Sequence, residues 1–323
     1  MSRAAAIATT TIRQPDVPLW SALFETTKPG ITRLVTITAL VGAGLGLLSV
    51  AATGNGPTTG NLLLVALGVL VGTAMAAGGA NALNMFQERD LDEHMPRTVG
   101  RPIQRGRLLP KHVLAFGAML AIAGCLVLWI STGPVPAVLA AICAVSYCLI
   151  YTPSKTRTVW STLIGTVPGA LPPMLGWSAA VGGSFEQIIA SEPLFLFALM
   201  TVWQIPHFLA IAWIYRRDYR RGGFRVLPTI DPRGGLTAVV VTIGTAVLIA
   251  VSLAGTIAMP TLLGPAYLTV AAVTGVGFAW LTIRFVRRRT ITTARGVFFG
   301  SVAHLPLLML AMVIDAFVRT MSA

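Results

Sequence analysis

Charged residues are scarce in this chain, since Asp, Glu, Lys and Arg make up only 11% of its 323 residues. An ordinary soluble domain carries about 25%, whereas 55% of the residues here are hydrophobic. This shortage of charge excludes a soluble globular enzyme and a disordered tail protein. Three cysteines are too few for a secreted disulfide scaffold, and no Cys/His spacing indicates zinc or an iron–sulfur cluster. The composition therefore favours a polytopic helical membrane protein.

Long stretches without a single charge divide the chain into candidate membrane spans, each of about 20 residues. Six such stretches provide room for two, two, one, one, two and one spans. They are 34–87, 112–154, 158–185, 193–215, 234–283 and 296–314. Turn-forming Gly and Pro residues interrupt the longest, for instance at 54–57. We therefore expect an all-α integral membrane protein with nine transmembrane helices, in which glycines such as Gly42 mark close helix packing.

The basic residues give this topology a direction. The chain has 24 Lys and Arg against 11 Asp and Glu, and nine spans place 23 of the 24 on one side, leaving only Arg319 on the other. Cytoplasmic loops carry such an excess, so we expect a cytoplasmic N-terminus and an outside C-terminus. The net charge of +13 then needs no nucleic-acid partner to explain it.

Domain boundaries and location follow from the same reading. We expect a cytoplasmic N-terminal segment (1–32), one transmembrane domain (33–318) and a short tail (319–323). The first 20 residues contain no apolar signal segment followed by a cleavage site. A multi-pass protein of the bacterial plasma membrane is expected, with a mitochondrial inner membrane as the alternative.

The few acidic residues cluster at the end of the second expected span. Asn84, Glu88 and Asp92 are spaced four apart, so a continuous helix places them on one face, and Asn81 joins the same stripe. Carboxylate and amide oxygens suit Mg²⁺, which typically takes one or two carboxylates and bridges to substrate phosphates. The alternative is a solvated loop whose acids offset neighbouring arginines.

Basic residues that could bind a diphosphate lie on the same side of the expected membrane. Arg97 and Arg101 follow the acids within a loop's reach. Lys155 and Arg157 belong to another loop on that side. The next span contains three prolines between 168 and 173, which should kink or unwind it. Irregular backbone at membrane depth is tolerated only where it is buried in protein or lines a cavity, and we expect this span to line a cavity.

A third group follows the sixth span. His207 lies inside that span, where an ionisable side chain is a functional candidate, and Asp218 is a lone acid among four arginines. Asp218 is either a further metal ligand or a partner for those arginines. His207 either acts on a substrate or hydrogen-bonds a backbone carbonyl. For His304 we favour packing or a hydrogen bond over metal ligation, and Asp315, at the far end of the last span, is expected to be solvated.

These segments together resemble the UbiA-type intramembrane prenyltransferases, and among them the branch that farnesylates haem. The first family motif, N-x-x-x-D-x-x-x-D, is matched by Asn84, Glu88 and Asp92. The branch continues it as D-x-x-M-x-R-T-x-x-R-P, which matches 92–102. The stretches Y-T-P-x-K, P-G-A-x-P-P-x-x-G-W, W-Q-x-P-H-F and D-Y-x-x-x-G follow in order. The resemblance covers roughly residues 20–318.

The resemblance implies nine helices around a central cavity, farnesyl diphosphate as donor, haem B as acceptor and haem O as product. It implies that Mg²⁺ is held at the acidic motifs by Asn84, Glu88, Asp92 and Asp218. Residues implied to bind substrate are Asn81, Arg97, Arg101, Lys155, Arg157, His207 and Tyr219. Hand-over of the product to a haem A synthase or a terminal oxidase could follow.

Two departures from the family pattern stand out. Glu88 replaces the commoner aspartate, and Gly222 stands where many members have the second acid of D-x-x-x-D. The second departure makes a second complete Mg²⁺ site doubtful. A prenyltransferase for another aromatic or chlorin acceptor is the alternative enzyme. A transporter is the non-enzymatic alternative, but its acids should lie within the spans.

Overall fold

In the computed structural model, residues 18–52, 59–182 and 184–322 are described, and these contain helices and no strand. The turn expected at 54–57 lies outside them, as do Arg3 and Arg13. The longer helices are α2 (Pro29–Ala52), α3 (Thr59–Gln87), α5 (Pro110–Thr132), α6 (Pro134–Val145), α9 (Thr166–Val181), α11 (Ser191–Ile214), α14 (Gly235–Leu253), α16 (Pro265–Arg288) and α17 (Ile291–Ser322). The shorter ones are α1 (Leu19–Thr26), α4 (Arg89–Asp92), the π-helix η1 (Ser146–Tyr151), α7 (Thr152–Arg157), α8 (Ser161–Ile164), α10 (Phe185–Ile188), α12 (Arg216–Arg221), α13 (Leu227–Ile230) and α15 (Gly255–Ala258).

Eight helices among these described residues are long and apolar enough to cross a membrane, one fewer than the nine expected. The difference lies in the predicted span 158–185. There the chain forms the short α8 and then α9, which has 16 residues. The division falls at Gly165, and α9 continues through Pro172 and Pro173, so the prolines do not unwind it as expected.

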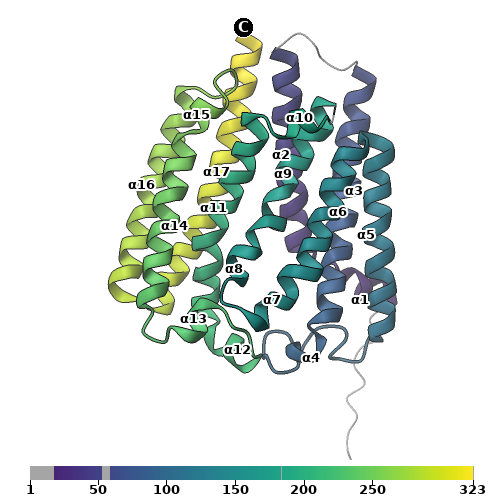
Figure 1. Cartoon of the computed structure of the whole chain (residues 1–323), viewed down its shortest axis with the longest axis vertical. Helices are drawn as coiled ribbons and strands as arrows, with labels where there is room; N and C mark the ends of the chain where they lie inside the picture. Colours follow the sequence, from purple (N-terminus) through teal and green to yellow (C-terminus); the bar gives the residue numbers. More distant parts are fainter. Residues whose placement is uncertain (1–17, 53–58, 183, 323) are drawn as a thin grey trace, which may run out of the picture.

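The long helices lie side by side in one bundle (Figure 1). Helix α1 and the C-terminal end of α17 lie at opposite ends of it. Helices α4, α7, α12 and α13 gather at the α1 end, which we call the basic end because most of the arginine-rich loops lie there. Helix α17 continues to Ser322, so the expected C-terminal tail is helical up to that residue. Helix α2 already begins at Pro29, inside the expected N-terminal segment.

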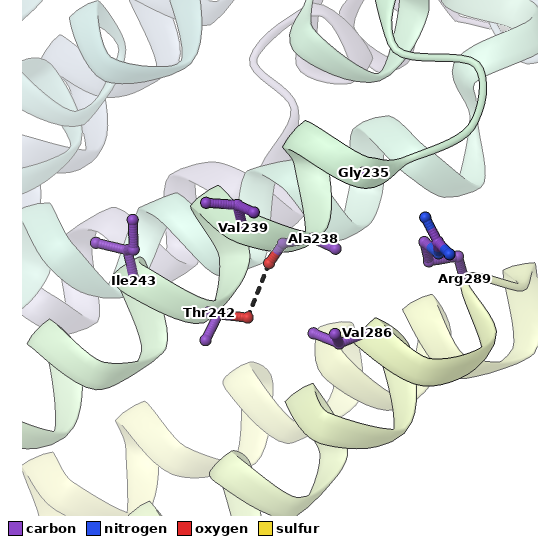
Figure 2. A pocket seen from close by; sticks show the side chains of 7 residues that line it. All are labelled: Gly235, Ala238, Val239, Thr242, Ile243, Val286 and Arg289. Carbon is purple, nitrogen blue, oxygen red and sulfur yellow. Dashed lines mark hydrogen bonds between the residues drawn. The ribbon is translucent and has the colours of Figure 1, made fainter.

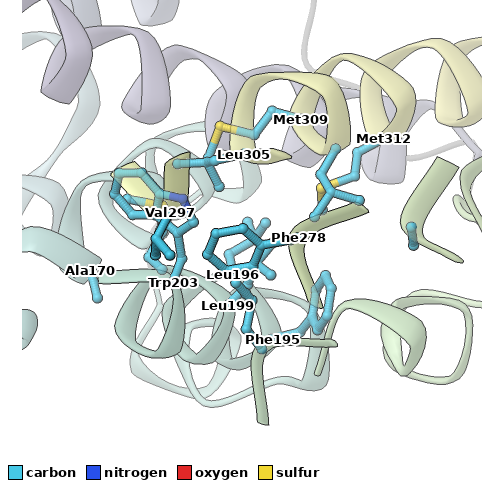
Figure 3. Close-up of a cluster of buried hydrophobic side chains, with 14 of the residues drawn as sticks. Ala170, Phe195, Leu196, Leu199, Trp203, Phe278, Val297, Leu305, Met309 and Met312 are labelled. Carbon is cyan, nitrogen blue, oxygen red and sulfur yellow. The ribbon is translucent and has the colours of Figure 1, made fainter. Parts of the chain in front are cut away.

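Helix α11 forms the centre of the largest apolar core. It packs against α9, α14 and α17. Figure 3 shows part of this core, in which Leu196, Leu199 and Trp203 of α11 lie among Phe278 of α16 and Leu305 of α17. Helix α11 is therefore enclosed over most of its length, and its side chains can be held in fixed positions.

Glycines allow two pairs of helices to approach closely. A Cβ on Gly42 of α2 would lie 2.0 Å from the carbonyl oxygen of Pro173 in α9. A Cβ on Gly124 of α5 would lie 2.3 Å from the backbone nitrogen of Ala76 in α3. Small residues commonly mediate helix association in lipid, where the hydrophobic effect does not drive it. The bundle therefore depends on the absence of side chains at these contacts.

Two of the three prolines in α9, Pro172 and Pro173, leave backbone carbonyls without helical partners. Pro172 has no N–H to donate to the carbonyl of Pro168, four residues earlier. The thiol of Cys143 in α6 donates to that carbonyl instead, at 3.0 Å between sulfur and oxygen. Cys143 therefore helps explain how α9 stays helical.

The expectation that Asp315 is solvated is wrong. Its side chain is buried in α17 and accepts hydrogen bonds from the backbone N–H of Gly264 at 2.7 Å and of Tyr267 at 2.9 Å. These groups belong to the beginning of α16, where a carboxylate satisfies unpaired N–H groups and the helix dipole. Asp315 thus connects the ends of two long helices.

Gly42→Ala should destabilise the protein by about 1–3 kcal/mol, because the new methyl group overlaps the α9 backbone. Gly44→Ala is the control on the same helix, since nothing lies within 4 Å of the place its methyl group would take. It should be neutral or stabilising, because alanine favours helix. Thermal unfolding of both variants in detergent measures this. Equal melting temperatures would contradict the close approach of α2 and α9.

Candidate active site

The acidic motif crosses a small break between α3 and α4. Helix α3 ends at Gln87, but the Glu88 N–H still bonds the Asn84 carbonyl at 2.9 Å, and the Asp92 N–H bonds that of Glu88 at 2.8 Å. The four-residue spacing is therefore retained, and Asn84, Glu88 and Asp92 are all buried. Asp90, two residues from each carboxylate, does not share their face of the helix and is exposed. Burial of the two acids rules out the solvated loop considered from the sequence.

Each of the three motif side chains contacts a cation from a different part of the chain. Lys155 of α7 lies 2.7 Å from Glu88, between Nζ and Oε1. Arg101, in the loop before α5, forms an ion pair with Oδ2 of Asp92. The Lys28 ammonium donates to Oδ1 of Asn84. These cations relieve the repulsion expected between two carboxylates one helical turn apart.

The loop that carries Arg101 is folded back onto the motif by local hydrogen bonds. The buried Thr98 hydroxyl lies 2.8 Å from the Asp92 carbonyl oxygen and 3.2 Å from that of Met95. The N–H of Arg101 bonds the Thr98 carbonyl at 3.0 Å. These hydrogen bonds give a physical reason for the spacing of Thr98 and Arg101 after Asp92. In the sequence that spacing was only part of a family motif.

Lys28 is the member of this cluster that sequence reasoning missed. It lies in the turn between α1 and α2, with a φ of 50° that is uncommon outside glycine. Its position directly before an apolar run could have indicated a role, but the positive-inside rule already accounted for a basic residue there.

Burial and neighbouring charges move the pKa values of these groups in different directions. Burial lowers the pKa of Lys28 to about 7, and Arg101 contributes to this. Burial would raise the pKa of Glu88, but Lys155 and Lys28 outweigh it and hold that pKa below its usual value. Burial raises the pKa of Asp92 despite the attraction of Arg101. The two carboxylates are therefore not equivalent.

A hollow of about 230 Å³ lies at the basic end beside the motif. Glu88 and Asp92 line one part of it, together with the cations of Arg97, Arg101 and Lys155. The remaining lining is mostly apolar or aromatic: Met95, Tyr151, Ser161, Thr162, Phe208, Ile211, Ala212, Tyr219, Phe224 and Val226. A charged group and an apolar one could therefore be held side by side. We call this space the polar hollow.

Family membership is shown by a match that extends over most of the chain. The model of the UbiA prenyltransferase family matches residues 35–305. This chain belongs to the UbiA prenyltransferase family.

Curated relatives of this UbiA-family chain include proteins named protoheme IX farnesyltransferase. That of Solibacter usitatus is 40% identical and aligns over 90% of this chain and 97% of its own. That of Opitutus terrae is 38% identical, over 92% and 95%.

Solved structures share the fold at lower identity. A solved structure described as that of digeranylgeranylglyceryl phosphate synthase has a TM-score of 0.71 at 16% identity. The match covers 92% of this chain and 98% of that chain. A UbiA homolog from Archaeoglobus fulgidus bound to DMAPP and Mg²⁺ has a TM-score of 0.60 at 12% identity, covering 89% and 99%. At these identities the likeness concerns the fold alone.

Some residues predicted for the site do not line the polar hollow. Asp218 is half-buried on α12 and absent from the lining, although its neighbour Tyr219 belongs to it. Arg157 is exposed at the end of α7. Asn81 and Asn84 lie behind the lining, where Asn81 bonds Thr32 at 3.1 Å. Roles for these residues in metal or substrate binding remain predictions.

Both intramembrane histidines lie against a serine hydroxyl of a neighbouring helix. His207 bonds the hydroxyl of Ser301 at 2.8 Å rather than a backbone carbonyl. His304 is almost fully enclosed and lies 3.4 Å from the hydroxyl of Ser252. Neither lines the polar hollow, although Phe208, adjacent to His207, does.

A second hollow of about 350 Å³ opens between α14 and α16 (Figure 2). Its lining is Gly235, Ala238, Val239, Thr242, Ile243, Val286 and Arg289. Two of these, Val239 and Ile243, are more than half exposed. None of the seven is a carboxylate, so this groove has no ligand set for a hard cation.

The residues of the polar hollow fit a magnesium ion that is shared with a substrate. Oδ1 of Asp92 is buried without a hydrogen-bond partner, which leaves one hard oxygen ligand available. No group of three or more His, Cys, Asp or Glu in the described ranges could hold a metal by itself. Two carboxylates are nevertheless what Mg²⁺ commonly uses when phosphate oxygens complete its coordination.

The Glu88–Lys155 ion pair should show strong coupling in a double-mutant cycle. Lys155→Met leaves Glu88 without its counter-charge and should lower the free energy of unfolding by about 3–5 kcal/mol. Adding Glu88→Gln should recover part of that loss, giving a coupling of roughly 1–3 kcal/mol. Reversible unfolding in mixed detergent measures both quantities.

The pair Arg89 and Asp90, 3.5 Å apart, is the matched control, since Asp90 is exposed and Arg89 is only half-buried. Its cycle, made with Arg89→Met and Asp90→Asn, should give a coupling of about 0–1 kcal/mol. A coupling for Glu88 and Lys155 no larger than this would contradict a buried, desolvated pair.

Proposed function

We propose that this chain transfers a farnesyl group from farnesyl diphosphate to the vinyl group of haem B, forming haem O and releasing diphosphate. The observation that carries the proposal is the buried pair Glu88 and Asp92, countered by basic side chains on one wall of a hollow that is otherwise apolar. The names of its relatives, protoheme IX farnesyltransferase, support this choice of substrates.

Glu88 and Asp92 would hold Mg²⁺ against the diphosphate, through Asp92 Oδ1 and the Glu88 carboxylate. When bound, the ion would neutralise charge that develops on the departing diphosphate. Asn84 supports the motif from behind, since its side chain bonds Lys28 and the Thr152 hydroxyl. Asp218 would add a ligand only by approaching the hollow, which it does not line.

The basic residues would bind the remaining diphosphate charge. Arg97 is well placed for this because its guanidinium stacks on Tyr219, 4.7 Å from the ring centroid, and no acid among residues 18–52, 59–182 and 184–322 pairs with it. Arg101 and Lys155 each contact one carboxylate and also line the hollow, so they can face the diphosphate as well. Together these cations stabilise the leaving group in a partly water-excluded site.

The apolar part of the hollow would shield the reaction from water. The C–O bond of farnesyl diphosphate breaks with its electron pair leaving on diphosphate, and an allylic cation develops. The vinyl π-electrons of haem form the new C–C bond, and water adds to the resulting cation with loss of a proton. Phe208, Ile211 and Phe224 offer apolar surface next to the charged wall, where the farnesyl chain can lie.

The membrane arrangement that accompanies this function has nine crossings. Helix α7 lies at the basic end, whereas α10 and the start of α11 lie at the other end. Helices α8 and α9, which come between α7 and α10 in the chain, would therefore form the ninth crossing together. The basic end would be cytoplasmic. In a bacterial plasma membrane the site would then open to the cytoplasm. The haem O product would then pass to a haem A synthase or terminal oxidase.

Purified protein in lipid nanodiscs, supplied with haem B, farnesyl diphosphate and Mg²⁺, should yield haem O, detected by mass spectrometry. Chelation with EDTA should abolish the product, and added Mg²⁺ should restore it. If haem B stays unmodified while an aromatic acid or a chlorin is prenylated, the acceptor is wrong. If no prenylation occurs with any of them, the enzymatic proposal itself fails.

Asp92→Asn should reduce the rate of haem O formation by roughly 100-fold, because the variant loses an anionic metal ligand at the point where charge develops. Asp90→Asn is the control, since Asp90 is exposed and lies outside the hollow. It should retain nearly the full rate. Full activity of Asp92→Asn at limiting Mg²⁺ would overturn the assignment of Asp92.

A further inference from the structure

His207 is held by a contact between α11 and α17 that fixes its ring. Its Nδ1 lies 2.8 Å from Oγ of Ser301. The adjacent Trp203 indole N–H donates to the Ser301 carbonyl, also at 2.8 Å. Ser301 therefore forms hydrogen bonds with two α11 side chains, Trp203 and His207, which lie one helical turn apart.

The hydrogen bonds of Ser301 determine which ring nitrogen of His207 carries the proton. The single hydroxyl proton of Ser301 is donated to the Phe298 carbonyl at 2.6 Å. Oγ can then only accept from His207, so Nδ1 must be the protonated nitrogen. Nε2 consequently carries a free lone pair.

That lone pair accepts no hydrogen bond from any residue that the structure describes. His207 is 9% exposed, compared with 2% for His304. The imidazole also packs against two aromatic rings. Its centroid is 4.6 Å from Trp203, which is stacked, and 5.2 Å from Phe298. Figure 3 shows Trp203 within the buried core.

Such a histidine has the features of a metal ligand. A ligating imidazole typically donates its other N–H to a fixed acceptor, which sets the tautomer and ring orientation. Neutral imidazole is a common axial ligand of haem iron. An unpaired, oriented nitrogen inside a span also calls for an occupant, because unsatisfied polar groups are costly there.

The position of His207 fits the acceptor substrate. It precedes Ile211 of the polar hollow by four residues, or about 6 Å along the helix. The vinyl groups of haem lie at the rim of the macrocycle, at a comparable distance from the iron. An iron at His207 can therefore place a vinyl group near the hollow where the diphosphate end of the donor would lie.

His304 does not share these features. It is only 2% exposed, its Nδ1 is enclosed without a partner, and its ring stacks on Phe278 at 5.8 Å. A macrocycle cannot reach either nitrogen without opening the core. His304 is therefore a suitable comparison residue from the same membrane interior.

We infer that Nε2 of His207 is the axial ligand of the iron of the acceptor haem, with Ser301 as the positioning residue that fixes its tautomer. This inference rests on the proposed function, since it assumes that haem is the acceptor. Coordination would anchor the macrocycle by its centre while one vinyl group at its edge reacts. It would also explain a preference for iron protoporphyrin over the metal-free ring.

The test is the optical and electron paramagnetic resonance spectrum of ferric haem B bound to the purified full-length protein in nanodiscs. The wild-type protein should show histidine ligation. His207→Gln can still donate to Ser301 but does not ligate iron comparably, so it should lose that signature. Free imidazole should restore it. His304→Gln should keep the wild-type spectrum.

Ser301→Ala tests the positioning role by a readout that simple packing would not move. Loss of the Nδ1–H acceptor should weaken haem binding roughly 10- to 100-fold and raise the haem reduction potential, because the imidazole becomes a poorer electron donor. Ser301→Thr, which keeps the hydroxyl, should behave like the wild type.

The inference fails if His207→Gln, folded as judged by its gel-filtration profile, binds haem with an unchanged spectrum. It also fails if His304→Gln, rather than His207→Gln, loses the signature. Either result is separable from failure of the proposed function. When the inference alone fails, the wild type still makes haem O, whereas failure of the proposed function means that no haem O forms from haem B and farnesyl diphosphate.

Discussion

Two carboxylates one helical turn apart, both removed from water, can remain ionised only beside cations. This constraint organises the basic end of the protein. Glu88 and Asp92 obtain their counter-charges from α7 and from the loop before α5, and Asn84 receives Lys28 from the turn before α2. The motif, the loop that follows it and two segments distant in sequence must therefore converge for these charges to be tolerated. Buried ion pairs add little net stability, but leaving one partner unpaired is strongly unfavourable, so the arrangement is specific.

The same pairing leaves ligand capacity for a substrate complex. Lys155 and Arg101 each contact one oxygen of their carboxylate, and the other Asp92 oxygen stays unpartnered. A divalent cation bound to that oxygen would therefore compete with neither ion pair for it. The cations and a metal ion would then face a diphosphate from the same wall. In this arrangement the charges that make the acids tolerable in the folded protein are also those that favour departure of the anionic leaving group.

The sequence could predict those parts of the site that depend on local spacing. The helical register of Asn84, Glu88 and Asp92 follows from intervals of four, and Asp90 is exposed as that register requires. Scarcity of charge was enough to predict a helical membrane protein, and Gly42 was correctly expected to mark close helix packing. Lys28, Thr98 and the burial of Asp315 were not predictable. Their roles arise from contacts across the bundle, and each has a simpler local explanation as a surface charge, a loop residue or a helix end.

The count of membrane spans shows where composition stops being informative. A charge-free stretch such as 158–185 is compatible with one uninterrupted helix, yet Gly165 divides it, and α9 is then too short to qualify alone. Most of α9 is buried by protein rather than facing lipid, so hydropathy does not set its length. Its prolines free carbonyls that neighbouring helices must satisfy, as Cys143 does for Pro168. Tertiary contacts thus determine that α9 remains helical despite its prolines. Tertiary contacts also determine which nitrogen of His207 is left free.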